Sequence, residues 1–358
     1  MEWIQDLIAV LGQSLNSISQ GVMAMGLGFS LFATSFGFGA AALLSLVMGN
    51  VVPLSFQAES LALMAALSDD KHERRSILIV ASVLLLAIGL TPFADWLTNI
   101  SGTAILSAMM AGVGLMLSQI GYRSAESSPL VGWSSLVIAL LLYLTTQDLA
   151  LTIALSVIGA SAIAYFKNGK QPQPVSADVT QEGKLSVTKP KLTFNVIKGA
   201  LSFIALNLAG NISYGLITGQ MTGITPNPAN VNDITMIEGI SNLVASLFGG
   251  APVGAIISAT GDTPHPLFSN VLMTLFIAVI LFVKILPKMS RYIPSASLAG
   301  FLMVLGMFVI FPDNATAAMT SNMPLAAGAT VVITAISDPF TGLVSGTILR
   351  YLLPLLGL

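Results

Sequence analysis

Apolar segments of membrane length run along almost the whole of this 358-residue sequence and decide what it can fold into. A helix needs about 20 mostly apolar residues to cross the hydrocarbon core of a bilayer. Hydropathy and turn residues predict seven segments in each half of the chain, several of them too short for a full crossing. The segments expected in the first half are residues 7–33, 35–50, 54–68, 76–98, 100–121, 130–146 and 149–166. Those expected in the second half are residues 195–217, 233–249, 251–263, 266–286, 294–311, 325–337 and 340–356.

The composition excludes a water-soluble fold of this size. Only 8% of the residues are charged and 54% are hydrophobic, whereas a soluble domain carries about 25% charged residues. The acidic start of the chain, Met1–Asp6, lacks the basic region of a cleavable signal peptide. Cysteine is absent, and His72 and His265 lie far apart, so neither a disulfide framework nor a metal site is expected. We therefore predict an all-α polytopic membrane protein without a cofactor.

The two halves of the sequence resemble each other around a proline. Residues 43–53, which end in Pro53, are similar to residues 242–252, which end in Pro252. Weak internal similarity with a short interrupted segment in each half points to a transporter binding site. Chance similarity between two helices rich in Gly and Leu is the alternative. The expected organisation is a first repeat of seven segments over residues 1–166, a polar linker over 167–194 and a second repeat over 195–358.

The positive charges predict the orientation. With the segments counted in order, 13 of the 14 Lys and Arg residues fall on one side of the membrane, and Arg350 is the exception. Loops rich in Lys and Arg face the cytoplasm. The linker over 167–194 is therefore expected in the cytoplasm, and both termini are expected on the opposite side.

Glu59 is the strongest candidate for a functional residue. It lies inside the short apolar stretch Pro53–Leu67, which is too short to cross a bilayer as a helix. A charged side chain at the centre of a membrane helix costs roughly 2.5–3.5 kcal/mol on insertion scales, so such a residue is a functional candidate by default. A structural role, in which Glu59 caps or braces a neighbouring helix, is the alternative. Glu238 ranks below it because Asp233 nearby indicates an interfacial position.

Two segments carry a polar face. Gln13, Asn16 and Gln20 lie on one side of the first segment, and Asn207, Asn211 and Tyr214 lie on one side of the eighth. Such amides can simply form hydrogen bonds between helices. Because each of these segments opens a repeat, we also expect them to contact a substrate. Uncharged amides together with one carboxylate suit a neutral heterocycle that offers both donors and acceptors.

The second short segment is rich in glycine. Ser258 and Thr260 are expected at the start of a half-helix whose N–H groups point into the site. Asp262 and His265 lie beside Pro264 and Pro266, so they are expected at a helix end near the surface; a second proton-handling pair is the alternative. The glycines do not match a nucleotide-binding pattern.

The whole layout resembles the nucleobase:cation symporter family of uracil, xanthine and purine permeases, whose fold is shared with sulfate permeases and anion exchangers. Residues 53–60 are similar to the family segment in which a Pro-led stretch ends in a base-binding glutamate. The resemblance implies about 14 transmembrane segments as 7+7 inverted repeats, with two short Pro-led strands and half-helices, the third and tenth segments, at the bilayer centre. It also implies that Glu59 binds the substrate, with Ser258 beside it from the other half.

The sequence departs from the family in two ways. The family places its base-binding glutamate in the second half and its N-terminus in the cytoplasm, whereas Glu59 lies in the first half and the charges place the N-terminus outside. Both departures are explained if the two halves stand in swapped order, because exchanging two inverted repeats preserves the site and flips the termini.

These observations predict a secondary active transporter in the cytoplasmic (inner) membrane that takes up a nucleobase together with a proton, with Na⁺ as the alternative coupling ion. A core domain of segments 1–4 and 8–11 moves against a gate domain of segments 5–7 and 12–14. The residues expected to bind the substrate are Glu59, Gln57, Ser258, Gln20, Asn207 and Asn211, and Glu59 is expected to carry the proton.

The rival hypothesis is an anion transporter of the sulfate-permease type, which would use the positive ends of the half-helices. The absence of Lys and Arg from both short segments lowers this option. An enzyme is not expected, because paired carboxylates, His clusters and nucleophile–base arrangements are missing from the pattern. The bilayer and a small molecule are the expected partners, a homodimer stays open, and no nucleic-acid partner is expected.

Overall fold

The described part of the chain folds into helices with two very short strands. The computed structural model describes residues 2–147, 149–167, 185, 187–225, 228–286 and 292–357, so most of the predicted linker over 167–194 lies outside the described residues. The first half contains α1 (Glu2–Gly26), α2 (Leu31–Met48), β1 (Leu54–Ser55), α3 (Ala58–Leu67), α4 (Lys71–Gly89), α5 (Phe93–Ser127), α6 (Pro129–Thr146) and α7 (Leu149–Lys167). The second half contains α8 (Phe194–Met221), α9 (Val231–Ser246), β2 (Gly254–Ala255), the 3₁₀ turn η2 (Ala259–Asp262), α10 (Pro266–Phe282), the 3₁₀ turn η3 (Ser295–Leu298), α12 (Ala299–Val304), the π-helical segment η4 (Leu305–Ile310), α13 (Phe311–Met319), α14 (Pro324–Ile336) and α15 (Pro339–Leu355).

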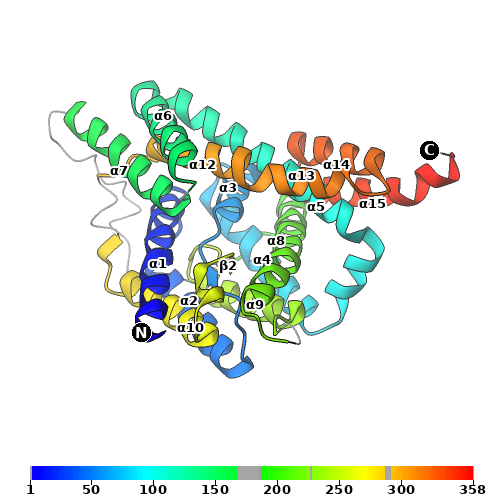
Figure 1. The fold of residues 1–358 in the computed structure, drawn as a ribbon, viewed down its shortest axis with the longest axis horizontal. Coiled ribbons are helices and arrows are strands. Elements are labelled where there is room, and N and C mark those ends of the chain that lie inside the picture. The colour runs from blue at the N-terminus through cyan, green and yellow to red at the C-terminus, as the bar shows by residue number, and fades with distance from the viewer. Residues whose placement is uncertain are drawn as a thin grey trace.

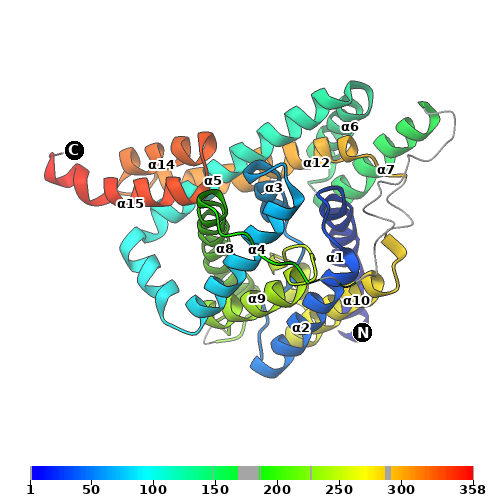
Figure 2. The same ribbon diagram turned by 180° about the vertical axis from the view of Figure 1, so that it is seen from behind.

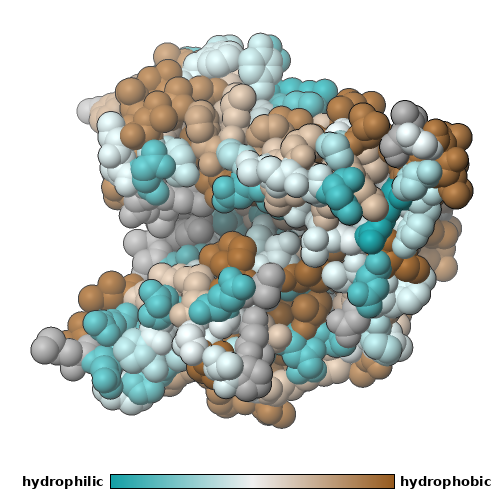
Figure 3. Space-filling model, turned by 45° about the vertical axis from the view of Figure 1, so that its right-hand side comes forward, coloured by the Kyte–Doolittle hydropathy of each residue, from teal (hydrophilic) through white to brown (hydrophobic). Residues whose placement is uncertain are grey.

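The outer surface fits a lipid environment. Five helical stretches of the described chain are long and apolar enough to cross a membrane: Leu31–Met48, Trp96–Ser127, Pro129–Thr146, Phe194–Met221 and Ala296–Met319. Large apolar side chains such as Ile8, Val47 and Ile336 are exposed. Figure 3 shows hydrophobic side chains over much of one face, which is hollowed between an upper and a lower part. The predicted multi-pass membrane protein is confirmed.

Capping residues move several helix ends away from the boundaries that hydropathy predicts. α4 begins at Lys71 rather than at residue 76, because the Asp70 side chain accepts a hydrogen bond from the His72 N–H at 2.9 Å and so caps the helix. This hydrogen bond also lowers the pKa of the Asp70 carboxyl group. α2 is capped in the same way by Ser30. Hydropathy misses such ends because the first turn of a capped helix can be polar.

The two proline-led segments meet as a pair of antiparallel strands. Leu54 of β1 lies opposite Ala255 of β2, and the Ile256 N–H donates to the Pro53 carbonyl at 3.0 Å. Each proline stands just before its strand, where its missing N–H removes no ladder hydrogen bond. The predicted Pro-led strands are therefore present, and they join the two halves of the chain.

Buried asparagines satisfy the backbone that these short strands leave unpaired. Asn242 accepts from the Val253 N–H at 2.6 Å and donates to the Val253 carbonyl at 2.9 Å. Asn270 donates to the Asn50 carbonyl at 2.8 Å, and Asn50 in turn donates to the Val52 carbonyl. In a bilayer such partners are required, because water is not available to solvate non-helical backbone.

The helical pieces after the two strands differ in length. α3 runs for 10 residues after β1, whereas only the four-residue 3₁₀ turn η2 follows β2. The sequence of α3 is rich in Ala, Leu and Met, which favour helix. After β2, Gly261, Pro264 and Pro266 interrupt the chain within a few residues, so a longer helix cannot form.

The helices fall into two groups, visible from both sides in Figures 1 and 2. One group, called here the α5 group, contains α5, α6, α7 and α12 to α15, and the other, called the α8 group, contains α1, α2, α4, α8, α9 and α10; most close helix pairs lie within a group. Small residues allow the closest approaches: a Cβ on Gly37 would meet the Ser241 carbonyl, and one on Gly300 would meet the backbone of Ser135. The division of the segments into a gate domain and a core domain, and the movement of one against the other, stay predictions.

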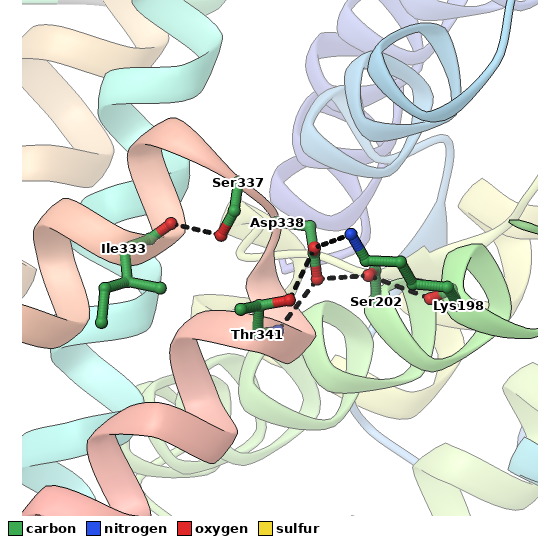
Figure 4. Close-up of polar contacts among 6 residues, drawn as sticks. All are labelled: Lys198, Ser202, Ile333, Ser337, Asp338 and Thr341. Carbon is green, nitrogen blue, oxygen red and sulfur yellow. Dashed lines mark hydrogen bonds and ion pairs between the residues drawn. The ribbon is translucent and has the colours of Figure 1, made fainter.

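One polar network joins the two groups. Asp338 caps α15, where its side chain accepts from the Thr341 N–H at 2.9 Å and from the Thr341 hydroxyl at 2.8 Å. From α8, the Ser202 hydroxyl donates to Asp338 at 2.6 Å and the Lys198 ammonium lies 3.1 Å from the same carboxylate (Figure 4). Asp338 is buried, whereas Lys198 is half exposed. This carboxylate therefore ties α8 to the start of α15.

A glycine permits the bend inside α5. Gly102 has φ 76° and ψ 154°, a conformation that is essentially restricted to glycine and costs other residues about 1–3 kcal/mol. A Cβ at this position would also collide with the Arg350 guanidinium. We expect Gly102→Ala to lower the free energy of unfolding by at least about 1–3 kcal/mol, measured as thermal unfolding of the detergent-purified protein. Gly39→Ala is the matched control, because a Cβ there meets open space; equal melting temperatures for the two variants would contradict the expectation.

Candidate functional site

A cavity of about 450 Å³ lies between the two helix groups, beside the start of α3. Its size is within the range of small-molecule sites. One wall comes from α1, α3, α8 and the residues after β2, and the other from α5, α12, η4 and α13. The polar side chains that line it are Gln13, Gln20, Glu59, Thr103, Ser107, Ser213, Tyr214, Asp313 and Asn314.

Glu59 lies at the wall of this cavity, in the first turn of α3. Its side chain is 5% exposed, and its Oε1 atom accepts a hydrogen bond from the Tyr214 hydroxyl at 2.5 Å. The first turn of a helix carries unpaired N–H groups and a partial positive charge, which favours a carboxylate there. The Glu59 carboxyl group, the Tyr214 hydroxyl and the N-terminus of α3 therefore meet at one point of the cavity.

The amides beside Glu59 hold the framework of the site. Gln57 donates from Nε2 to the Ala255 carbonyl at 3.0 Å and accepts from the Ser60 hydroxyl, which lies 3.2 Å from Asn207 Oδ1. Gln57 and Asn207 are buried and do not line the cavity. They connect the start of α3 to β2 and to α8. A Cβ on Gly254 would press against both of them, so glycine is needed for this close approach.

The other two predicted residues also lie behind the cavity wall. Ser258 caps η2 by accepting from the Thr260 N–H at 3.1 Å, and Asn211 donates to Glu238 on α9 at 2.7 Å. Of the six residues expected to bind a substrate, Gln20 and Glu59 thus line the cavity, whereas Gln57, Ser258, Asn207 and Asn211 support its walls. The side chain of Asn16 is outside the described part of the chain.

Two titratable residues, Glu238 and His265, have surroundings that the sequence did not indicate. Glu238 is completely buried within the protein, whereas the nearby Asp233 suggests an interfacial position. His265 does not pair with Asp262; its Nδ1 atom lies 2.8 Å from Asp6 on α1, and the Trp3 ring stacks on its imidazole with centroids 4.3 Å apart. The His265 pair connects α1 to α10 and does not line the cavity.

The wall opposite Glu59 contains polar residues that sequence reasoning missed. Thr103 and Ser107 lie one helical turn apart on α5, directly after the bend at Gly102, and Asp313 and Asn314 lie in α13, next to the π-helical η4. Bends and π-helical turns often occur at functional sites. The glycine before Thr103 and the proline before Asp313 were the available signals, but neither shows which side of its helix faces the cavity.

The ionisable side chains at the cavity are acidic apart from the Tyr214 phenol, among the described residues that line it. The described residues that line it include two carboxyl groups, Glu59 and Asp313, and no Lys, Arg or His. No group of three or more His, Cys, Asp or Glu residues that could hold a metal ion occurs in the described part of the chain. The site can therefore offer neutral donors, neutral acceptors and the two carboxyl groups to a ligand.

Solved structures share this arrangement of helices. The transmembrane domain of a cyanobacterium bicarbonate transporter, BicA, matches 97% of this chain with 97% of its own, at 16% identity and a TM-score of 0.67. The murine Slc26a9 anion transporter in the inward-facing state matches 99% of this chain with 68% of its own, at 12% identity and a TM-score of 0.69. A second SLC26A9 structure matches to the same degree, with 66% of its own chain covered.

This chain has the fold of these anion transporters. The likeness confirms the predicted polytopic fold with its third and tenth broken segments. It does not support the nucleobase:cation symporter family in particular, because the structures above are of a bicarbonate transporter and an anion transporter. No protein-family model and no curated protein sequence matches the chain.

Proposed function

We propose that this protein is a secondary active transporter that moves a small anion together with a proton across the cytoplasmic membrane. Two observations support the proposal: the fold it shares with anion transporters, and a cavity between two helix groups that contains a buried carboxyl group. In this proposal, the α8 group moves against the α5 group and exposes the cavity to each side in turn. The predicted cytoplasmic linker and extracytoplasmic termini belong to the same proposal.

The cavity attracts an anion without a basic side chain. The N-terminus of α3 provides a partial positive charge, as helix N-termini do for anions in other proteins. Thr103, Ser107 and Asn314 supply neutral donors from the opposite wall. These donors bind the anion between the α8 group and the α5 group, and the bound anion brings the two helix groups together.

The position of Glu59 at the cavity is the observation that supports proton coupling. An ionised Glu59 and an anion at 4 Å would repel each other by about 4 kcal/mol at an effective dielectric constant of 20. Binding is therefore favoured when Glu59 is protonated, and the proton then crosses the membrane with the anion. Tyr214, which donates to Glu59 at 2.5 Å, supports the carboxylate after the proton leaves.

A nucleobase is the second candidate substrate. The specific observation in its favour is the absence of Lys, Arg and His from the described residues that line the cavity. A neutral heterocycle would need no positive side chain, and Gln20, Glu59 and Asn314 offer the mixed donors and acceptors that its edges require.

The test is uptake into proteoliposomes with and without an inward proton gradient. The panel contains bicarbonate, sulfate, chloride, a dicarboxylate, uracil and xanthine, and internal pH is followed with a trapped dye. We expect a small anion to accumulate with the gradient and to acidify the lumen. Accumulation of a base alone would favour the second candidate, and uptake of an anion without acidification would remove the proton from the proposal.

The Tyr214→Phe variant tests whether the Tyr214 hydroxyl stabilises the Glu59 carboxylate. A hydrogen bond to a charged group is worth about 1.5–3 kcal/mol, so we expect the initial rate of proton-driven uptake to fall about tenfold or more. Tyr143→Phe on α6 is the matched control, because Tyr143 does not line the cavity. Equal rates for both variants would show that the hydroxyl of Tyr214 does not assist Glu59.

A further inference from the structure

One turn of α8 holds two buried carboxyl groups from different helices. The Tyr214 hydroxyl donates to Glu59 at the cavity, and the Asn211 amide donates to Glu238 Oε2 on α9 at 2.7 Å. Asn211 and Tyr214 are three residues apart and lie on the same side of α8. The proposed mechanism uses Glu59 and leaves Glu238 without a role.

The Glu238 pair contains two unsatisfied atoms. Glu238 and Asn211 are both 0% exposed. The Asn211 amide nitrogen donates to Glu238 Oε2 and, at 3.2 Å, to the Thr235 hydroxyl. Glu238 Oε1 and Asn211 Oδ1 have no hydrogen-bond partner. A buried unpaired polar atom costs about 1–3 kcal/mol, and more when it is charged, so native proteins rarely leave two together.

No positive side chain balances Glu238 within the described residues. α2 and β2 contain no ionisable residue. The charged first turn of α4 is remote from Glu238, because Arg75 in that turn lies beside Gly249, whereas the part of α4 that packs on Gly239, next to Glu238, is at Leu86.

The ionisable groups on the remaining elements do not balance it either. α8 contributes Tyr214, which is engaged with Glu59, and Lys198, which is engaged with Asp338; α9 itself adds Asp233, a further acid. On α5, Arg123 and Glu126 lie in the last turns, and the side chain of Asp95 is outside the described residues.

We propose that Glu238 and Asn211 form a second proton-binding site, separate from the one at Glu59. A proton on Glu238 Oε1 removes the uncompensated charge and turns an unpaired acceptor into a donor. Asn211 Oδ1 is an unpaired acceptor within the same pair of side chains, so one proton can give both Glu238 Oε1 and Asn211 Oδ1 a hydrogen-bond partner. Because α8 carries the partners of both carboxyl groups, a movement of α8 acts on both sites. This last step rests on the proposed transport function.

Infrared difference spectroscopy during a pH titration tests the site without any substrate. A protonated carboxyl group has a C=O stretching band that an ionised one lacks. We expect one such band to be present in the wild type and in Glu59→Gln, and to be lost completely in Glu238→Gln. Glu126→Gln, at an exposed position on α5, is the control and should keep the band. In Asn211→Leu the band should shift, because the carboxyl group loses its amide acceptor.

Two results would overturn the proposal. The first is a set of carboxyl bands that Glu238→Gln leaves unchanged at every pH, since Glu238 would then stay ionised. The second is a band that responds to Na⁺ and not to choline at constant pH, since the site would then bind a metal cation. Neither result depends on transport, so a failure of the proposed function would be seen separately, in the proteoliposome assay. If Glu238→Gln fails to fold, the shift of the carboxyl band in Asn211→Leu decides whether Glu238 binds the proton.

Discussion

Replacing Glu59 by glutamine is expected to abolish proton-driven uptake while the protein stays folded. Glutamine has nearly the shape of a protonated glutamate and can keep a hydrogen bond with the Tyr214 hydroxyl, so the cavity wall should persist. It cannot release a proton. We therefore expect accumulation under a proton gradient to fall to the level of protein-free liposomes. Exchange of internal for external substrate at equal pH should continue, because a neutral side chain already favours binding of the anion.

The comparison of these two assays makes the Glu59 experiment decisive. Loss of accumulation with retained exchange assigns proton coupling to Glu59, whereas loss of both indicates that the carboxylate itself binds the substrate, as the nucleobase hypothesis requires. Glu126→Gln is again the matched control, and its uptake should equal that of the wild type. Unchanged accumulation in Glu59→Gln would falsify the proposed coupling. Thermal unfolding of each detergent-purified variant shows whether the fold is intact.

Replacing Asp338 by alanine is expected to destabilise the protein by about 2–3 kcal/mol. Removing a helix N-cap costs about 0.5–2 kcal/mol, and the lost hydrogen bonds from Ser202 and from the Thr341 hydroxyl add about 1 kcal/mol or more. The ion pair with Lys198 should add little, because the ammonium is half exposed and solvent screens it.

Asp338→Asn separates these contributions. Asparagine caps helices about as well as aspartate and can still accept from Ser202, but it carries no charge. We expect its thermal unfolding in detergent to lie close to that of the wild type and well above that of Asp338→Ala. If both variants melt at the same reduced temperature, the ion pair with Lys198 would be the main stabilising contact. If neither differs from the wild type, this network does not hold α15 against α8.

The sequence by itself determined the class of fold and two residues that line the cavity. Long apolar segments, the scarcity of charge and the repeated Pro-led segments are local properties, and the bilayer allows few backbone arrangements. The strands at Leu54 and Gly254 and the position of Glu59 at the cavity were therefore readable from the chain. Gln20 also lines the cavity, as expected from the polar face of its helix.

Only the tertiary structure decided which groups meet. Thr103 and Asp313 line the cavity because α5 and α13 pack opposite α3, and Glu238 is buried because α9 packs against α2, α4 and α8. Such pairings depend on helix rotation and on contacts between residues far apart in the chain, and hydropathy contains no information about either. The same limit applies to the substrate: the residue types suited a neutral base, and the proposal of an anion that arrives with a proton arose only once the fold shared with anion transporters was known.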